Sequence, residues 1–211
     1  GSFEYLKRGI PGSPGTKLIS VSGDCKHPGI YEVEWGMTVA ELLDLCEADN
    51  PFFIQVSGPS GECISIKEKY RRISMLDLLA QKDIRCGGSF MIFNSHRDLV
   101  HILMNFSAFF KHESCGVCTP CRAGNFIIER KLERLNNGLA DMNDLKELKS
   151  WGTIMKTTSR CGLGKTASNA IIQSLEKFNE YFEARFSATD NSTYQKFDHM
   201  KAVAQYEQYK P

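Results

Sequence analysis

The sequence lacks the features of a membrane, secreted or nucleic-acid-binding protein. No apolar run approaches the roughly 20 residues that cross a bilayer, and the N-terminal residues carry no apolar signal-peptide core. Lys and Arg number 26 against 25 Asp and Glu, which gives a net charge of +1. Charge alone therefore attracts neither nucleic acid nor an anionic membrane. We expect no nucleic-acid partner, no direct membrane insertion and a cytoplasmic location, either free or peripheral to a membrane complex.

A dinucleotide-binding fingerprint is also missing. The glycine-rich stretch SGPSG at 57–61 is followed by no predicted helix, so it does not resemble a loop that cradles phosphates. No glycine-rich turn joins a predicted strand to a helix in the manner of a Rossmann unit. We therefore expect that this chain alone does not bind NADH, and we identify no catalytic residue.

What the sequence does contain is eight cysteines with an uneven distribution. Four are widely spaced and are interpreted as packing residues, because free cysteine behaves as a small hydrophobe: Cys25, Cys46, Cys63 and Cys86. The others include a tight cluster. In a chain without a secretory signal, clustered thiols bind metal more often than they form disulfides.

The clustered thiols follow the pattern C-x2-C-x2-C-x39-C. Cys115, Cys118 and Cys121 lie in HESCGVCTPCRAG, and Cys161 follows in SRCGLGKT. A [4Fe–4S] cubane fits this set because each of its four irons needs one thiolate. A two-cluster ferredoxin is excluded, since the position of its next cysteine is Asn125 here. Spacing favours a cluster over zinc, which usually takes two separated C-x2-C pairs; zinc and unliganded or disulfide-bonded thiols remain as alternatives.

The first half of the chain has the alternating pattern of strands. Thr38 is a candidate N-cap for one short helix. The predicted elements are a hairpin of 17–23 and 30–35, a helix over 39–48, strands at 52–58 and 62–68, a helical turn at 74–80 and a strand at 89–94. This order predicts a small β-grasp domain.

From residue 95 the apolar period becomes helical. The predicted helices cover 98–112, 119–135, 142–157 and 167–186. The fold class is therefore α+β, with a β-grasp domain followed by a helical bundle that carries the cysteines. We expect a linker at 1–16, a β-grasp domain at 17–94, a helical domain at 95–187 and a C-terminal tail at 188–211.

The segments ESCGVCTPCRAG and SRCGLGKTASN resemble the C-terminal part of the NADH-binding flavoprotein subunit of complex I-like oxidoreductases. This family includes diaphorase subunits of NAD-reducing hydrogenases and flavoprotein subunits of NAD-dependent formate dehydrogenases. SPGTKLISVSGDCKHPGIYEV is similar to the start of the family's soluble-ligand-binding β-grasp domain. The resemblance covers about residues 9 to 180, and the double cysteine motif is highly specific.

The resemblance implies that Cys115, Cys118, Cys121 and Cys161 hold one [4Fe–4S] cluster. The cluster would exchange single electrons with FMN, which NADH reduces, and with a further redox centre. The domain that binds FMN and NAD(H) has no counterpart here, so we expect it on a missing domain or another chain. The implied partners are that domain and other iron–sulfur subunits of an NADH dehydrogenase or diaphorase complex. The alternative is a non-catalytic interaction module with a structural metal site.

Overall fold

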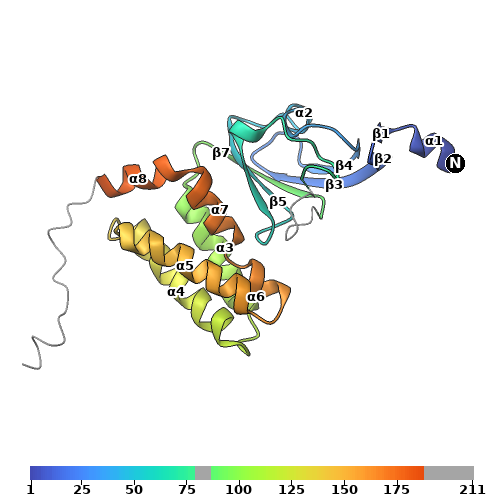
Figure 1. The fold of residues 1–211 in the computed structure, drawn as a ribbon. Coiled ribbons are helices and arrows are strands. Elements are labelled where there is room, and N and C mark those ends of the chain that lie inside the picture. The colour runs from blue at the N-terminus through green and yellow to red at the C-terminus, as the bar shows by residue number, and fades with distance from the viewer. Residues whose placement is uncertain (79–86, 188–211) are drawn as a thin grey trace, which may run out of the picture.

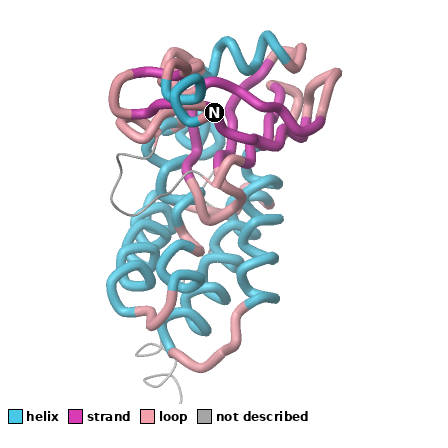
Figure 2. Tube along the Cα trace, turned by 90° about the vertical axis from the view of Figure 1, so that its right-hand side faces the viewer, coloured by secondary structure: helices cyan, strands magenta, loops and turns pink. Residues whose placement is uncertain are grey.

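A five-stranded mixed sheet rests on a bundle of helices in the computed structural model, which describes residues 1–78 and 87–187 (Figure 1). Strands gather at one end of the molecule and helices at the other, as the view in Figure 2 shows. This α+β arrangement confirms the predicted fold class.

The sheet has the order β4-β3-β7-β5-β6. Its strands are β3 (Thr16–Gly23), β4 (Gly29–Glu34), β5 (Pro51–Val56), β6 (Glu62–Ser65) and β7 (Ser89–Asn94). The central pair, β3 and β7, is parallel, and all other neighbours are antiparallel. A 3₁₀ turn, η1 (Ile66–Glu68), follows β6. The hairpin and the three further strands are thus where the alternating pattern predicts them.

Helix α2 (Val39–Leu45) begins at Thr38 through a capping box. The Thr38 hydroxyl accepts a hydrogen bond from the Glu41 backbone N–H, and the Glu41 carboxylate accepts one from the Thr38 N–H, so two otherwise unpaired donors are satisfied. The apolar side of α2, which includes Val39, Leu42 and Leu43, packs on one face of the sheet.

Strands β5 and β7 are covered on both faces. Side chains alternate between the faces of a strand, so Ile54 and Ile92 join the core under α2, while Phe53 and Phe93 face the helical bundle. The rings of Phe53 and Phe93 stack with centroids 4.8 Å apart. An irregular register between Pro51 and Phe53 breaks the alternation at that end of β5. The burial of every residue from Phe53 to Val56 therefore reflects a strand with no solvent face.

The helices of the second half enclose one apolar core that also contains Phe53 and Cys63 from the sheet. They are α3 (Leu99–Glu113), α4 (Thr119–Asn136), α5 (Met142–Thr158), α6 (Gly162–Thr166), α7 (Asn169–Lys177) and α8 (Asn179–Ser187). Among the described residues, none of these helices is long and apolar enough to cross a bilayer.

The prediction of a single helix over 167–186 is wrong. The chain leaves helical geometry at Phe178 (φ −123°, ψ 36°), which separates α7 from α8. The ring of Phe178 then lies against Phe52 and Phe53, with centroids 4.8 and 5.9 Å away. Apolar periodicity along one segment cannot reveal such a contact with a strand more than a hundred residues earlier. Helix α6 was likewise not expected.

The N-terminal residues, expected as a linker, lie along the edge of the sheet. They form α1 (Ser2–Leu6), β1 (Gly9–Ile10) and β2 (Ser13–Pro14). Arg8 pairs with Glu34 at 2.7 Å, and the Tyr5 hydroxyl donates to the Thr16 carbonyl at 2.9 Å. The first residues are thus held to β3 and β4.

Three predictions fall wholly or partly outside the described residues. They concern the tail at 188–211, the packing role of Cys86 and the end of the helical turn at 74–80. Residues 75–78, which are described, form a turn rather than a helix.

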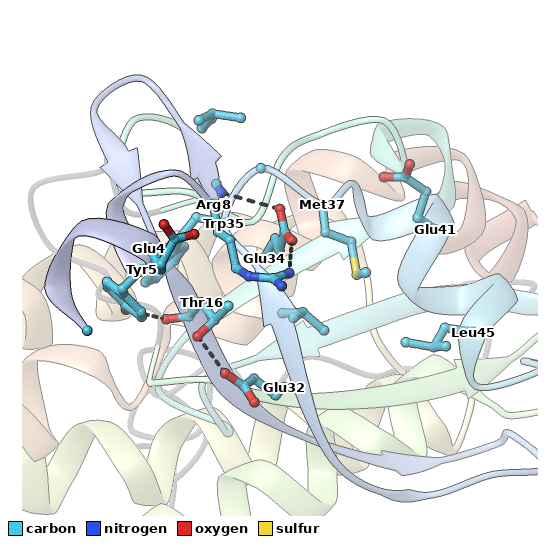
Figure 3. A pocket seen from close by; sticks show the side chains of 15 residues that line it. Glu4, Tyr5, Arg8, Thr16, Glu32, Glu34, Trp35, Met37, Glu41 and Leu45 are labelled. Atoms are coloured by element: carbon cyan, nitrogen blue, oxygen red, sulfur yellow. Dashed lines mark hydrogen bonds and ion pairs between the residues drawn. The ribbon is translucent and has the colours of Figure 1, made fainter.

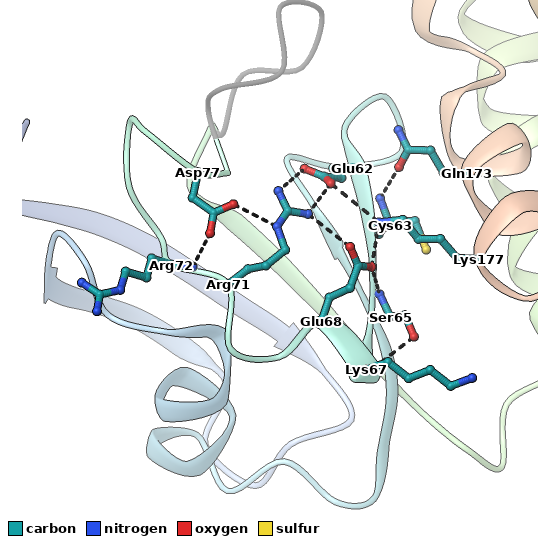
Figure 4. Close-up of polar contacts among 10 residues, drawn as sticks. All are labelled: Glu62, Cys63, Ser65, Lys67, Glu68, Arg71, Arg72, Asp77, Gln173 and Lys177. Atoms are coloured by element: carbon teal, nitrogen blue, oxygen red, sulfur yellow. Dashed lines mark hydrogen bonds and ion pairs between the residues drawn. The ribbon is translucent and has the colours of Figure 1, made fainter.

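A buried charge network ties the sheet to α7 (Figure 4). Glu62, whose side chain is 1% exposed, pairs with Arg71 and, at 3.7 Å, with Lys177. Lys177 also binds Glu68 at 2.8 Å and donates to the Cys63 carbonyl at 2.7 Å. Because each buried charge has an opposite partner, its cost of burial is offset, and α7 is held at one position along β6.

A second buried charge joins α4 to α5. Asp144 is 5% exposed and binds Lys131 at 2.7 Å and Arg134 at 3.1 Å. It also accepts the backbone N–H of Asp141 at 3.0 Å, which completes a capping box at the start of α5. The carboxylate therefore fixes both the start of α5 and its contact with α4.

We predict that Asp144→Asn lowers the free energy of unfolding by about 1–3 kcal/mol. Hydrogen bonds to charged groups contribute about that much, and Lys131 and Arg134 lose their charged acceptor. Chemical denaturation measures the change. The control is Glu133→Gln, which removes the exposed pair of Arg130 and Glu133 and should change stability by no more than about 0.5 kcal/mol. Equal effects of the two substitutions would contradict a special role for Asp144.

The same variant gives a pH test. Burial by itself raises the pKa of the Asp144 carboxyl, but hydrogen bonds from Lys131 and Arg134 outweigh burial and leave the pKa below its ordinary value of 3.8. A carboxyl with a lowered pKa stabilises the fold above its unfolded-state pKa and loses that contribution as the pH falls through the folded-state value. We expect the stability difference between the parent and Asp144→Asn to be constant above about pH 5 and to shrink below about pH 4.

Candidate iron–sulfur site

The three closely spaced cysteines lie where α3 ends and α4 begins. Cys115 and Cys118 are in the connection between the helices, and Cys121 is in the first turn of α4. Cys115 is exposed, Cys118 is half-buried and Cys121 is only 4% exposed. The spacing of three thus spreads the thiols from the surface to the edge of the bundle core.

Local interactions shape this connection. Gly116 has a φ of +71°, a left-handed conformation that favours glycine. Its N–H donates to the Ser114 hydroxyl at 3.2 Å, and its carbonyl accepts from the Arg122 guanidinium. Pro120 lies in the first turn of α4, where a missing N–H costs no helical hydrogen bond. The chain therefore turns at Gly116 and enters α4 at Cys118.

The fourth cysteine occupies the N-cap of α6, after α5 ends at Thr158. Cys161 is exposed. Helix α6 packs so tightly that a Cβ at Gly164 would lie 3.1 Å from the Cβ of Cys121 and 2.7 Å from that of Ser159. Only glycine at this position lets α6 lie against the start of α4.

The segment of Cys161 affects the chemistry of one of the clustered thiols. The backbone N–H groups of Arg160, the residue before Cys161, and of Cys121 favour the thiolate form of Cys118. The N–H of Arg160 is the main reason that the pKa of the Cys118 thiol is lowered from its ordinary value of 9.0. A lowered pKa favours the thiolate, the form that binds metal.

Polar groups also gather around Cys121. Its sulfur lies 3.2 Å from the Ser114 hydroxyl and 3.4 Å from the Asn125 amide nitrogen. The hydroxyl of Ser159 is buried and has no hydrogen-bond partner among the described residues. A donor without a partner beside Gly164 and Cys121 is suited to an acceptor such as an inorganic sulfide.

The arrangement of the thiols bears on the kind of metal centre. Among the described residues, no three His, Cys, Asp or Glu side chains are grouped closely enough to hold a metal ion. Zinc gathers its cysteine ligands at about 2.3 Å from one point, whereas a cubane receives each thiolate on a different iron. Four cysteines on two adjoining segments, beside the buried hydroxyl of Ser159, are suited to supply one thiolate to each iron of a cubane.

The sequence pattern did not reveal the residues that surround the sulfurs: Ser114, Asn125, Ser159 and Gly164. Asn125 alone carried a signal, because it lies four residues after Cys121 and so faces the same side of α4. Ser114 reaches Cys121 through the turn between α3 and α4. Ser159 and Gly164 depend on the packing of α6 against α4, which joins two segments that are far apart in the chain.

A surface pocket of about 430 Å³ flanks the cysteine connection and is lined by Lys111, Ser114, Arg122, Asn125 and Phe126, among others. Lys111 pairs with Glu129 on α4, and Arg122 binds the Gly116 carbonyl. Both cations thus stabilise the local structure.

A larger cavity of about 1060 Å³ lies between the N-terminal residues, β4 and α2, and no cysteine lines it (Figure 3). Its carboxylates have partners within the chain. Glu34 binds Arg8 at 2.7 Å, and Glu32 accepts from the Thr16 hydroxyl at 2.7 Å. These contacts explain the acidic lining without a ligand.

Comparison with known proteins places the cysteines in a recognised region. A profile of the NADH-ubiquinone oxidoreductase-F iron–sulfur binding region matches residues 101–185. The chain is 44% identical over 207 residues to the NAD-reducing hydrogenase HoxS subunit alpha of Cupriavidus necator, covering 98% of this chain and 34% of that protein.

More distant relatives belong to two further oxidoreductases. The NADP-reducing hydrogenase subunit HndC of Solidesulfovibrio fructosivorans is 33% identical, over 83% of this chain and 37% of that protein. One subunit of the NADH-quinone oxidoreductase of Mycobacterium tuberculosis is 31% identical, over 87% of this chain and 42% of that protein. The chain thus spans between a third and a half of the length of these relatives.

The fold has a counterpart among solved structures. A chain of the NAD⁺-reducing [NiFe]-hydrogenase in the H₂-reduced state superposes with a TM-score of 0.81 at 31% identity, over 99% of this chain and 36% of that chain. This chain therefore carries the NADH-ubiquinone oxidoreductase-F iron–sulfur binding region, and almost its whole length is similar to one part of subunits of NAD-reducing hydrogenase and of NADH-quinone oxidoreductase.

Proposed function

We propose that Cys115, Cys118, Cys121 and Cys161 together bind one [4Fe–4S] cluster. The observation that carries this proposal is the close approach of α6 to the start of α4, where a Cβ at Gly164 would lie 3.1 Å from the Cβ of Cys121, so that the distant segment lies beside the clustered one. Four thiols on two adjoining segments supply one ligand for each iron. When bound, the cluster supplies a centre that accepts and releases one electron at a time.

The surrounding residues have separate tasks in this proposal. Ser114 and Asn125 hydrogen-bond the Cys121 sulfur, which stabilises negative charge on it. The start of α4 directs the positive end of its dipole toward the same place. Phe106 and Phe110 on α3 are buried in the adjoining core and keep water from that side. The exposed side at Cys115 and Cys161 leaves a route for electron exchange with a partner.

The chain would work as part of an NAD(H)-linked oxidoreductase of the NADH dehydrogenase or diaphorase type. Electrons would pass singly between FMN, on another domain or chain with the NAD(H) site, and a further redox centre on an iron–sulfur subunit. Supporting this, the relatives are named as subunits of NAD-reducing hydrogenase and of NADH-quinone oxidoreductase. A cytoplasmic location, free or peripheral to a membrane complex, suits this role.

The proposed domain division follows the change of structure near Asn94. The last strand ends at Asn94 and α3 begins at Leu99, which supports a β-grasp domain at 17–94 and a helical domain at 95–187, with a linker before them and a tail after them. The two units share an interface, because Phe53 and Cys63 of the sheet lie in the core of the helices.

The alternative function is an interaction module in which the metal is purely structural. The two functions differ in one measurable property. A cluster that is reduced and reoxidised at a physiological potential supports electron transfer, whereas one that stays in a single state throughout supports the structural role.

We predict that Cys161→Ala removes or degrades the cluster, because three thiolates leave one iron without a protein ligand. Iron and acid-labile sulfide are measured on anaerobically purified protein. The control is Cys63→Ala, since Cys63 is fully buried between β6 and α7, and it should keep the cluster content of the parent. Full cluster content in Cys161→Ala, or its loss in Cys63→Ala, would contradict the ligand assignment.

We predict that Asn125→Ala lowers the midpoint potential of the cluster. A hydrogen bond to a ligand sulfur stabilises the more negative, reduced state. A net hydrogen bond of about 1 kcal/mol corresponds to about 43 mV for one electron, so we expect a shift of a few tens of millivolts. An EPR-monitored redox titration measures it.

The matched control is Asn105→Ala, because Asn105 is an exposed asparagine within α3 that lines a different pocket. It should leave the potential unchanged. If the cluster is intact in Asn125→Ala and its midpoint potential is unchanged, Asn125 does not affect the potential.

A further inference from the structure

Two cysteines outside the proposed cluster site lie on neighbouring segments. Cys25 lies in the loop between β3 and β4, and Cys46 directly follows the last residue of α2. Cys46 belongs to the core under α2, Cys25 packs against that core, and both are free thiols. The sequence pattern alone indicates only a packing role for them, because 20 residues separate them in the chain.

The backbone holds the two segments in register. Cys25 forms an isolated antiparallel bridge with Ala48. The N–H of His27 donates to the Cys46 carbonyl at 3.1 Å, and the N–H of Lys26 donates to the Glu47 carbonyl at 3.2 Å. These bonds hold the segment of Cys25 against the segment of Cys46, and both residues contact the same core, so bringing the thiols together requires no rearrangement of the sheet.

The two thiols differ in access to solvent. Cys46 is fully buried, whereas Cys25 is partly exposed at the end of the sheet. Burial, with the neighbouring Cys25 thiol as a second cause, raises the pKa of Cys46 to about 11. A reagent from solvent therefore reaches Cys25 first, and Cys46 is placed to react afterwards within the protein.

We propose that Cys25 and Cys46 form a reversible dithiol–disulfide site, a covalent modification site separate from the cluster ligands. The oxidant is a low-molecular-weight disulfide, RSSR. The Cys25 thiolate attacks one sulfur of RSSR; a Cys25–SR bond forms, the RS–SR bond breaks, and the released RS⁻ takes up the proton that Cys25 gave to water.

The second step closes the bridge. The Cys46 sulfur attacks the sulfur of Cys25, the Cys25–SR bond breaks, and the Cys46 proton leaves with the second thiol, RSH. In total the two protein thiols lose two electrons and two protons, and RSSR becomes two RSH. Excess RSH reverses both steps. In cytoplasmic proteins disulfides are usually transient or redox-sensing, and this site has the form of such a sensor.

The position of the loop gives the bridge a structural consequence. Asp24, next to Cys25, binds Arg97 at 2.6 Å and accepts the Asn94 N–H at 3.0 Å. These residues form the passage from the last strand to α3. A bond between Cys25 and Cys46 fixes the loop against the end of α2, and through Asp24 it restrains the junction between the sheet and the helices.

The test uses the full chain, incubated without oxygen in stepped ratios of oxidised to reduced glutathione, then alkylated and digested with trypsin. The expected product is peptide 18–26 joined to peptide 27–67, two hydrogens lighter than their sum and released by dithiothreitol. Peptide 27–67 contains both Cys46 and Cys63. Cys63→Ala is therefore the matched control and should retain the joined product, whereas Cys46→Ala should lose it.

A second measurement keeps the test independent of digestion. Closing the loop between residues 25 and 46 restricts the unfolded chain, so the oxidised protein should melt a few degrees higher than the reduced protein, and this shift should vanish in Cys25→Ala. Free, alkylated Cys25 and Cys46 at every glutathione ratio would overturn the proposal, as would a lasting glutathione adduct on Cys25 or a bond between Cys25 and Cys63. Iron and sulfide content, measured on the same samples, reports separately on the cluster.

Discussion

The burial of β5 and β7 on both faces is the constraint on which the rest of the structure depends. Along β5, Ile54 faces the core under α2 and Phe53 faces the helical bundle. Because neither face meets water, the sheet needs a cover on each side, and α3 and α7 supply the second cover. The charge network of Glu62, Arg71 and Lys177 then fixes α7 along β6. The bundle is thereby anchored at one end, and the cysteine segments are formed where α4 and α6 begin.

The cysteine site depends on the close approach of α6 to the start of α4. Gly164 lets α6 lie against Cys121, and the Arg160 N–H is the main cause of the lowered pKa of the Cys118 thiol. The same approach brings the buried hydroxyl of Ser159 beside Gly164. The apolar core holds α6 against α4, and this packing places the Arg160 N–H and the Ser159 hydroxyl near the cysteines. These donors suit the anionic centre proposed here.

Thiols in three environments illustrate how the fold controls sulfur chemistry. Backbone N–H groups lower the pKa of Cys118, whereas burial raises the pKa of Cys46 to about 11 and that of Cys63 to about 12. The lowered pKa of Cys118 favours the thiolate that binds metal. Cys63 is buried on β6 against α7. Cys46 belongs to the core against which the partly exposed Cys25 packs. One residue type therefore serves packing and, as proposed, metal binding and reversible oxidation.

The sequence by itself determined the α+β class, most strands and helices, the cap at Thr38 and the four candidate ligands, because these follow from local periodicity, capping chemistry and spacing. It did not determine the break at Phe178, the approach of Ser159 and Gly164 to Cys121 or the pairing of the segments that carry Cys25 and Cys46. Each of these joins segments that are distant in the chain. Local sequence patterns indicate which face of a helix or strand is apolar. Only the packed structure determines which residues of other elements contact that face.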